Sequence, residues 1–145
     1  LSAPCSAEML FAHVIDLGGY PSWTDLVHRA TSEANTAPPT WDVELRARVG
    51  PLARSKRLRM QRTLLDTEHH AVRFERVELD GRRHSPWVLT AVVNESASDG
   101  VLAASLTMKL HYGGALWTGG VLERVLADQI TSGRDRLRQL VSATR

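Results

Sequence analysis

The chain has 145 residues, of which 43% are hydrophobic and 23% charged, and its formal net charge at pH 7 is +2. This is the length of one ordinary domain with a normal core, so we expect a single domain over residues 1–145. No apolar run reaches the roughly 18–20 residues that a membrane-spanning helix needs, and no basic segment followed by a long apolar one opens the chain. The sequence therefore predicts a soluble, cytoplasmic protein.

The cysteine and arginine content argues against further classes of protein. The one cysteine, Cys5, excludes an internal disulfide and has no partners at metal-ligand spacing, so we expect no metal and no other cofactor. Sixteen of the 18 basic residues are arginines, but acidic residues alternate with them, as in residues 42–48 and 73–78. This mixture, without a known reader motif, argues against nucleic-acid binding.

Two short elements are expected first. Ser6 is a good N-cap, and the apolar stripe after it predicts a helix of about ten residues that Gly18 and Gly19 end. The Tyr20-Pro21 pair then predicts a turn, followed by a second short turn or helix at residues 22–26. Because the chain opens at Leu1 without a methionine, we allow for a truncated first strand.

A sheet is expected next, because the apolar period changes from helical spacing to two. In residues 41–49, for example, apolar and charged side chains alternate. Polar and glycine-containing turns separate the segments, which predicts consecutive antiparallel hairpins. The expected strands are residues 26–32, 41–49, 56–64, 71–79, 86–94 and 101–112. The helical period then returns, and one apolar stripe predicts a long C-terminal helix from Leu116 to Ser142.

Two stretches of the chain carry a resemblance to a known superfamily. They are SAEMLFAHVIDLGGYPSWTDLV at residues 6–27, with its Tyr-Pro-x-Trp turn, and MKLHYGGALWTGGVLERVLADQITSGRDRLRQLV at residues 108–141. With the meander between them, they resemble the SRPBCC superfamily (START-like, birch-pollen-allergen-like), particularly its bacterial polyketide cyclase/dehydrase-like members. The resemblance implies an α+β helix-grip fold. In that fold a curved antiparallel sheet of about six or seven strands wraps around a long C-terminal helix, and two short helices follow the first strand.

A twisted sheet around one helix leaves space on its concave side, so we expect a cavity there. Strand parity places Arg62 and Arg76 toward this space, with Glu78 as a structural partner for Arg76; a one-residue shift of register would turn both arginines to solvent. Trp23 and Trp117 either border the cavity mouth or staple the short helices to the long one. Most of the other candidate residues could equally serve only to pack the core. The candidate ligand-binding residues are Trp23, Trp41, Met60, Arg62, Phe74, Arg76, Trp87, Leu89, Met108, Tyr112 and Trp117.

The resulting hypothesis is a protein that binds a hydrophobic small molecule of the polyketide, lipid or isoprenoid class, as a monomer or homodimer. One alternative is a polyketide aromatase/cyclase. Against it, residues 55–63 (SKRLRMQRT) stand where the resemblance implies a tryptophan-rich strand. No nucleophile motif occurs, and most of the six histidines fall in turns or on outward positions, so no catalytic residue is assigned. The other alternative is a protein-interaction module with a vestigial cavity.

Overall fold

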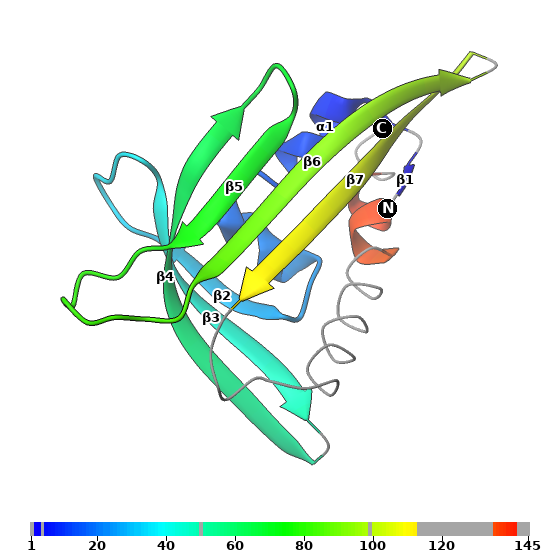
Figure 1. Ribbon diagram of the computed structural model, residues 1–145. Coiled ribbons are helices and arrows are strands. Elements are labelled where there is room, and N and C mark those ends of the chain that lie inside the picture. The colour runs from blue at the N-terminus through cyan, green and yellow to red at the C-terminus, as the bar shows by residue number, and fades with distance from the viewer. Residues whose placement is uncertain (1, 4, 50, 99, 113–134, 142–145) are drawn as a thin grey trace.

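The computed structural model describes residues 2–3, 5–49, 51–98, 100–112 and 135–141 of the chain. Its centre is one curved antiparallel sheet of seven strands in the order β1-β7-β6-β5-β4-β3-β2, shown in Figure 1. The sheet curls, so that the β3–β4 and β6–β7 hairpins extend in different directions (Figure 1). The strands are β1 (Ser2–Ala3), β2 (Val27–Ser32), β3 (Thr40–Val49), β4 (Leu52–Asp66), β5 (Ala71–Arg76), β6 (Trp87–Ser98) and β7 (Val101–Tyr112).

The predicted strands are confirmed in position, because the alternation of apolar and charged residues matches the two faces of the sheet. Strands β4 and β6 are longer than the predicted residues 56–64 and 86–94. Trp41 and Val43 of β3 are buried, whereas Asp42 between them is exposed. The register of β3 with β4 runs from Thr40 opposite Gln61 to Val49 opposite Leu52. A further short strand, β1, pairs with β7 at Ser105 and Ala104. The face that carries the buried residues is called the inner face below.

One strand is shorter than predicted. Strand β5 ends at Arg76 rather than Leu79, although the Val77 amide still donates to the Arg59 carbonyl at 2.9 Å. The next main-chain donor of β4, the Arg59 amide, is bound by the Glu78 carboxylate at 3.0 Å. The Glu78 side chain thus accepts the hydrogen bond that the main chain of β5 would otherwise accept, and the chain after β5 can leave the sheet.

The helical predictions for the N-terminal segment were partly wrong. Helix α1 (Ala7–Ala12) begins at the predicted N-cap, where Ser6 Oγ accepts from the Met9 amide at 3.2 Å, but it has six residues instead of about ten. A 3₁₀ helix, η1 (Leu17–Ser22), follows and contains both glycines that were expected to end the first helix. The Asp16 carboxylate starts it by accepting from the Gly18 amide at 2.8 Å. The second helical piece therefore ends at Ser22, the residue at which the sequence predicted that it would begin.

The predicted C-terminal helix is described only over residues 135–141, which are helical; residues 116–134 and 142 lie outside the described part. Leu137 and Val141 are fully buried in the same hydrophobic core as α1 and the inner face of the sheet. Arg136, the residue before Leu137, binds the two carboxylate oxygens of Asp25 through Nη1 and Nη2, both at 2.7 Å. This segment is thereby joined to the turn that follows Trp23.

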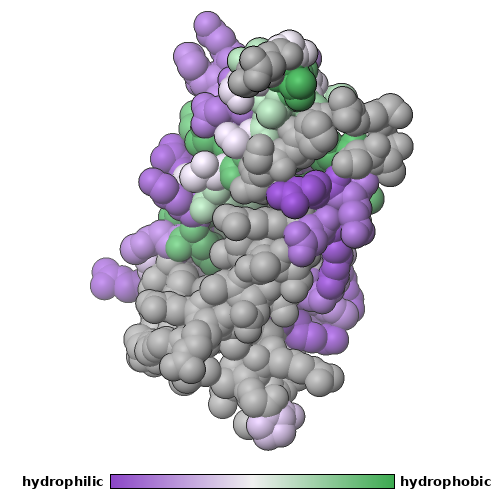
Figure 2. Space-filling view, turned by 90° about the vertical axis from the view of Figure 1, so that its right-hand side faces the viewer, coloured by the Kyte–Doolittle hydropathy of each residue, from purple (hydrophilic) through white to green (hydrophobic). Residues whose placement is uncertain are grey.

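The described surface carries both hydrophilic and hydrophobic side chains. Figure 2 shows hydrophilic residues in purple along both sides of one face, with small groups of hydrophobic residues in green between them. Among the described residues, six large hydrophobic side chains are exposed: Leu64, Leu65, Leu79, Val92, Val101 and Leu102. No helix within the described ranges is both long and apolar enough to cross a membrane.

Candidate functional site

The register of the sheet brings most of the predicted site residues to the inner face. Trp41 lies opposite Met60, and Met60 lies opposite Arg76. Arg62 lies opposite Phe74, and Phe74 lies opposite Leu89. Continuous pairing of β6 with β7 adds the remaining positions, Trp87 opposite Tyr112 and Ala91 opposite Met108. Residues that are distant in sequence therefore form neighbouring rows on one surface.

Four aromatic rings fill the part of the inner face next to η1. Phe74, fully buried, meets the Trp41 ring edge-on with centroids 5.6 Å apart and the Tyr20 ring at 6.2 Å. Tyr20 in turn packs against Trp23 at 4.7 Å. Such contacts add to the free energy of burying the rings and fix their orientation. This end of the inner face is closed by core packing.

Tyr20 anchors this cluster through its hydroxyl group, which donates to the Val14 carbonyl at 2.9 Å. Complete burial of the phenol raises its pKa far above the ordinary value, because the anion would lose its hydration. Tyr20 is therefore a neutral hydrogen-bond donor that ties η1 to the end of α1. From the sequence, Tyr20 was interpreted only as part of the Tyr20-Pro21 turn.

Trp23 is almost completely buried, at 6% exposure, rather than open to solvent. Its indole Nε1 is also buried and has no hydrogen-bond partner among the described residues. The second role that the sequence left open, a staple between the short helices and the long one, is observed in part, since the Trp23 ring rests on Tyr20 of η1. A role at a cavity mouth stays a prediction.

Arg62 lies on the inner face, as parity predicted, and is half-buried. Its Nη1 donates to the Ile15 carbonyl at 2.9 Å. A main-chain carbonyl between α1 and η1 is thus satisfied by a charged donor from the centre of the sheet. This contact assigns Arg62 a structural partner within the fold.

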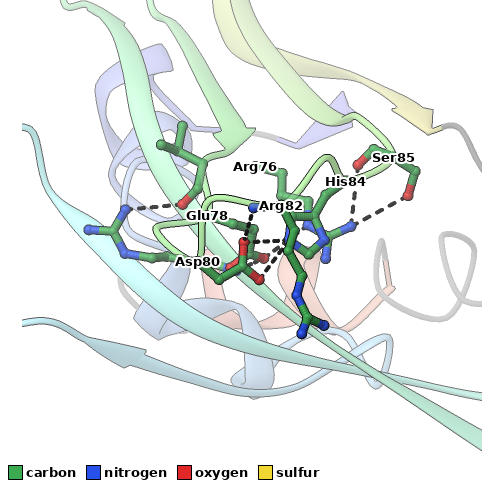
Figure 3. Close-up of polar contacts among 8 residues, drawn as sticks. Arg76, Glu78, Asp80, Arg82, His84 and Ser85 are labelled. Carbon is green, nitrogen blue, oxygen red and sulfur yellow. Dashed lines mark hydrogen bonds and ion pairs between the residues drawn. The ribbon is translucent and has the colours of Figure 1, made fainter.

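Arg76 lies one row away and is more deeply buried, with 9% of its side chain exposed. Its Nε donates to Glu78 Oε1 at 2.9 Å, as the shared parity predicted, and its Nη1 reaches the Ser85 carbonyl and hydroxyl at 3.3 and 3.4 Å. Figure 3 shows this network at the base of the loop between β5 and β6. The loop is therefore held to the sheet through Arg76.

The same loop contains a second hydrogen-bonded pair, visible in Figure 3, in which His84 Nε2 lies 2.8 Å from Asp80 Oδ2. Asp80 Oδ1 also accepts from the Arg82 amide at 3.0 Å. The hydrogen bond from the Arg82 amide, and to a smaller extent the one with His84, lowers the pKa of the Asp80 carboxyl. These bonds fix the turn around Gly81, whose φ of 72° favours glycine.

Lys56 is a residue of the inner face that sequence reasoning missed. It lies opposite Leu45 and shares parity with Leu58 and Met60, which was the available signal. Its Nζ lies 5.9 Å from the centroid of the Trp87 ring. Desolvation, followed by repulsion from Arg76, lowers the pKa of Lys56, while Glu78 acts in the opposite direction.

The inner face also carries apolar side chains that are only partly buried. They pack against the core but keep some accessible surface: Leu45, Leu89, Met108 and Leu110. Leu89 lies opposite Leu110, and Ala91 lies opposite Met108. Partly accessible apolar side chains therefore continue across β6 and β7 beside Trp87, beginning at Leu89 next to the packed ring of Phe74.

Two predicted site residues cannot be placed fully. The backbone of Tyr112 pairs with Trp87 at the end of β7, and Trp117 lies outside the described residues. Within the described ranges, no group of three or more His, Cys, Asp or Glu side chains is arranged to hold a metal ion.

Comparisons with known proteins address the fold. No protein-family model matches the chain, and no curated protein sequence matches it. The crystal structure of Ara h 8.0201 matches with 10% identity and a TM-score of 0.60, covering 99% of this chain and 94% of that one. The structure of XoxI from Bacillus cereus matches with 7% identity and a TM-score of 0.61, covering 97% and 91%.

These identities are too low to show more than architecture. The polyketide cyclase/dehydrase-like assignment within the superfamily remains a prediction from the sequence. The chain has the Bet v 1-like, helix-grip fold that its sequence resembles.

Proposed function

We propose that the protein binds a hydrophobic small molecule, of the polyketide, lipid or isoprenoid class, against the inner face of its sheet. The observation that carries the proposal is the set of apolar side chains on this face that remain partly accessible, including Leu89, Met108 and Leu110. Covering such surface contributes about 25 cal/mol per Å². A ligand seated there would gain affinity from apolar contact and orientation from the few polar groups nearby.

The division of the inner face supports this position for the ligand. Near η1 the face is filled by Tyr20, Trp41 and Phe74, so no ligand is expected there. Toward Leu89 and Leu110 the apolar side chains are less buried, and Arg76 and Lys56 lie close by. The ligand is therefore assigned to the region around Trp87 and Leu89.

Thermal melting with a panel of compounds tests the proposal. The panel holds dodecanoate and hexadecanoate, the isoprenoid alcohol farnesol and an aromatic polyketide of the anthraquinone type. A ligand at about 100 times its Kd stabilises a protein by about 2.7 kcal/mol, which raises the melting temperature of a domain of this size by about 5–10 °C. Native mass spectrometry of the purified protein would show any small molecule that stays bound.

Two neighbouring positions of β7 provide the variant and its control. Met108→Gln places a polar amide on the inner face at nearly constant length and should reduce the thermal shift. Thr107→Gln introduces the same amide side chain on the exposed outer face and should leave the thermal shift intact. Absence of any shift from all the compounds, with no bound molecule in the native mass spectrum, would contradict the proposal and favour an interaction module.

One observation favours a second candidate, a polyketide aromatase/cyclase. The inner face brings two cations and a carboxylate together, Lys56, Arg76 and Glu78, and a cationic group can stabilise a developing enolate. Incubation with a poly-β-ketone thioester, followed by mass spectrometry, tests this activity. A cyclised product that forms with the wild type and not with Arg76→Met would support it, whereas unchanged substrate would leave binding as the function.

A further inference from the structure

Three charged side chains gather on the inner face at the edge of the partly accessible apolar region. Arg76 comes from the end of β5, Lys56 from β4, and Glu78 from the first residues of the loop after β5. Arg76 Nε is bonded to Glu78 Oε1 at 2.9 Å, and Lys56 interacts electrostatically with both. This cluster, the Lys56–Arg76–Glu78 cluster, lies beside the buried ring of Trp87.

The cluster carries one more positive charge than negative. Its two cations face a single carboxylate, whose Oε1 is also bound by the Arg59 amide at 3.0 Å. The Arg59 guanidinium does not alter the balance, because both of its bonds to a carboxylate go to Glu33, at 2.9 and 3.0 Å. A partly desolvated excess charge is unfavourable unless an anion joins it.

Hydrogen-bond donors remain for such an anion. Arg76 uses Nε for Glu78 and makes two long contacts from Nη1, while its Nη2 has no bond to the described residues. Lys56 Nζ likewise makes no hydrogen bond within the described part of the chain, and the Trp87 ring is its neighbour at 5.9 Å. Carboxylates are well matched to a guanidinium with free N–H groups.

We propose that the ligand is an amphipathic monocarboxylic acid whose carboxylate binds between Arg76 and Lys56 while its apolar part covers Leu89 and Leu110. This inference rests on the proposed function and narrows its ligand class. One negative charge neutralises the excess of the cluster, whereas a phosphate dianion would reverse its sign. Arg62, another cation of the inner face, donates to the Ile15 carbonyl instead and takes no part.

Matched probes of equal chain length test the inference by isothermal titration calorimetry at pH 7.5. They are dodecanoate, dodecanol, dodecyl phosphate and dodecyltrimethylammonium, each below its micelle concentration. Dodecanoate should bind at least about tenfold more tightly than dodecanol, a difference of about 1.4 kcal/mol. The cationic probe should bind most weakly, because it meets like charge.

The chain offers an internal control, because Lys56 and Lys109 are its only lysines and Lys109 is exposed on β7. Lys56→Met keeps the aliphatic contact and the Arg76–Glu78 pair, so the fold should be retained. It should remove most of the preference for dodecanoate over dodecanol. Lys109→Met should change neither value, and Lys56→Arg should restore the preference.

Labelling of the amines gives a second measurement that does not depend on a variant. Acetic anhydride at limiting amounts, followed by peptide mass spectrometry, reports the modification of each lysine. Dodecanoate should protect Lys56 and leave Lys109 unprotected, and dodecanol should protect Lys56 less.

The outcomes separate the two proposals. Equal affinity of the wild type for dodecanoate and dodecanol would overturn the carboxylate site and leave hydrophobic binding intact. Tighter binding of dodecyl phosphate than of dodecanoate would overturn the assignment of a monoanion. Binding of none of the four probes would count against both proposals.

Discussion

Arg62 Nη1 donates to the main-chain carbonyl of Ile15 at 2.9 Å, which joins the middle of β4 to the segment between α1 and η1. The two residues are 47 positions apart in the chain. A charged donor on a carbonyl is among the stronger hydrogen bonds in a protein. The position of the short helices on the inner face therefore depends in part on this arginine.

Arg62→Met should destabilise the protein by about 1.5–3 kcal/mol, because it removes a charge-assisted hydrogen bond and leaves the Ile15 carbonyl without it. Urea denaturation measures this loss. Arg57→Met, on the exposed face of the same strand, is the matched control and should change the stability by less than about 0.5 kcal/mol. Equal effects of the two substitutions would show that the bond contributes nothing.

Tyr20→Phe should lower the free energy of unfolding by about 1–3 kcal/mol. The substitution keeps the ring that packs on Trp23 and Phe74 and removes only the hydroxyl that satisfies the Val14 carbonyl. The near-ultraviolet circular dichroism spectrum should retain its tryptophan bands, because the aromatic cluster persists. Unchanged stability would contradict the role assigned to this hydroxyl.

Glu78→Gln should destabilise the protein by about 1–3 kcal/mol, since it leaves the nearly buried Arg76 guanidinium without its counter-charge. The amide would still offer one oxygen to the Arg59 main chain. Glu75→Gln, whose partner Arg73 is 3.7 Å away and partly exposed, is the comparison and should cost less than about 1 kcal/mol. A larger loss for Glu75→Gln than for Glu78→Gln would contradict the importance of the inner pair.

The pair of Asp25 and Arg136 predicts a pH dependence of stability. Its hydrogen bonds to Arg136 lower the pKa of Asp25 in the folded protein. A lowered carboxyl pKa stabilises the folded state above the pKa of the unfolded chain, and this contribution is lost as the pH falls through the folded value. The melting temperature of the wild type should therefore exceed that of Asp25→Asn at pH 7, and the difference should shrink as the pH falls below about 3.9, the ordinary pKa of an aspartate. A difference that grows as the pH falls would contradict this sign.

The sequence predicted the strands well because their two faces differ strongly in polarity. Alternation in residues 41–49 located β3, and the parity of Met60, Arg62 and Phe74 located their shared face and the Arg76–Glu78 pair. The bounds of β5 were missed because a side chain, Glu78, replaces a strand partner, and side-chain contacts over this distance have no sequence signal.

The sequence predicted that two short helical elements precede the sheet, but it placed their ends wrongly. Gly18 and Gly19 read as a helix end, yet Asp16 begins a new 3₁₀ helix by binding the Gly18 amide, and both glycines lie inside it. Lys56 was overlooked although it has the parity of Leu58, Met60 and Arg62, which the sequence analysis placed toward the cavity. Its pairing with Leu45 of β3, and the 5.9 Å between its Nζ and the centroid of the Trp87 ring, place it on the inner face.

The central claim, that a hydrophobic molecule binds to the inner face, can be tested at single sites with the three methionines of the chain. Met60 and Met108 lie on the inner face, and Met9 lies on α1. With ¹³C-methyl methionine, nuclear magnetic resonance spectra recorded during titration with dodecanoate should show saturable shifts of Met108 and Met60 and little change at Met9. Saturable binding that moves only Met9, or no shift of any methyl signal with any of the proposed ligand classes, would contradict the account.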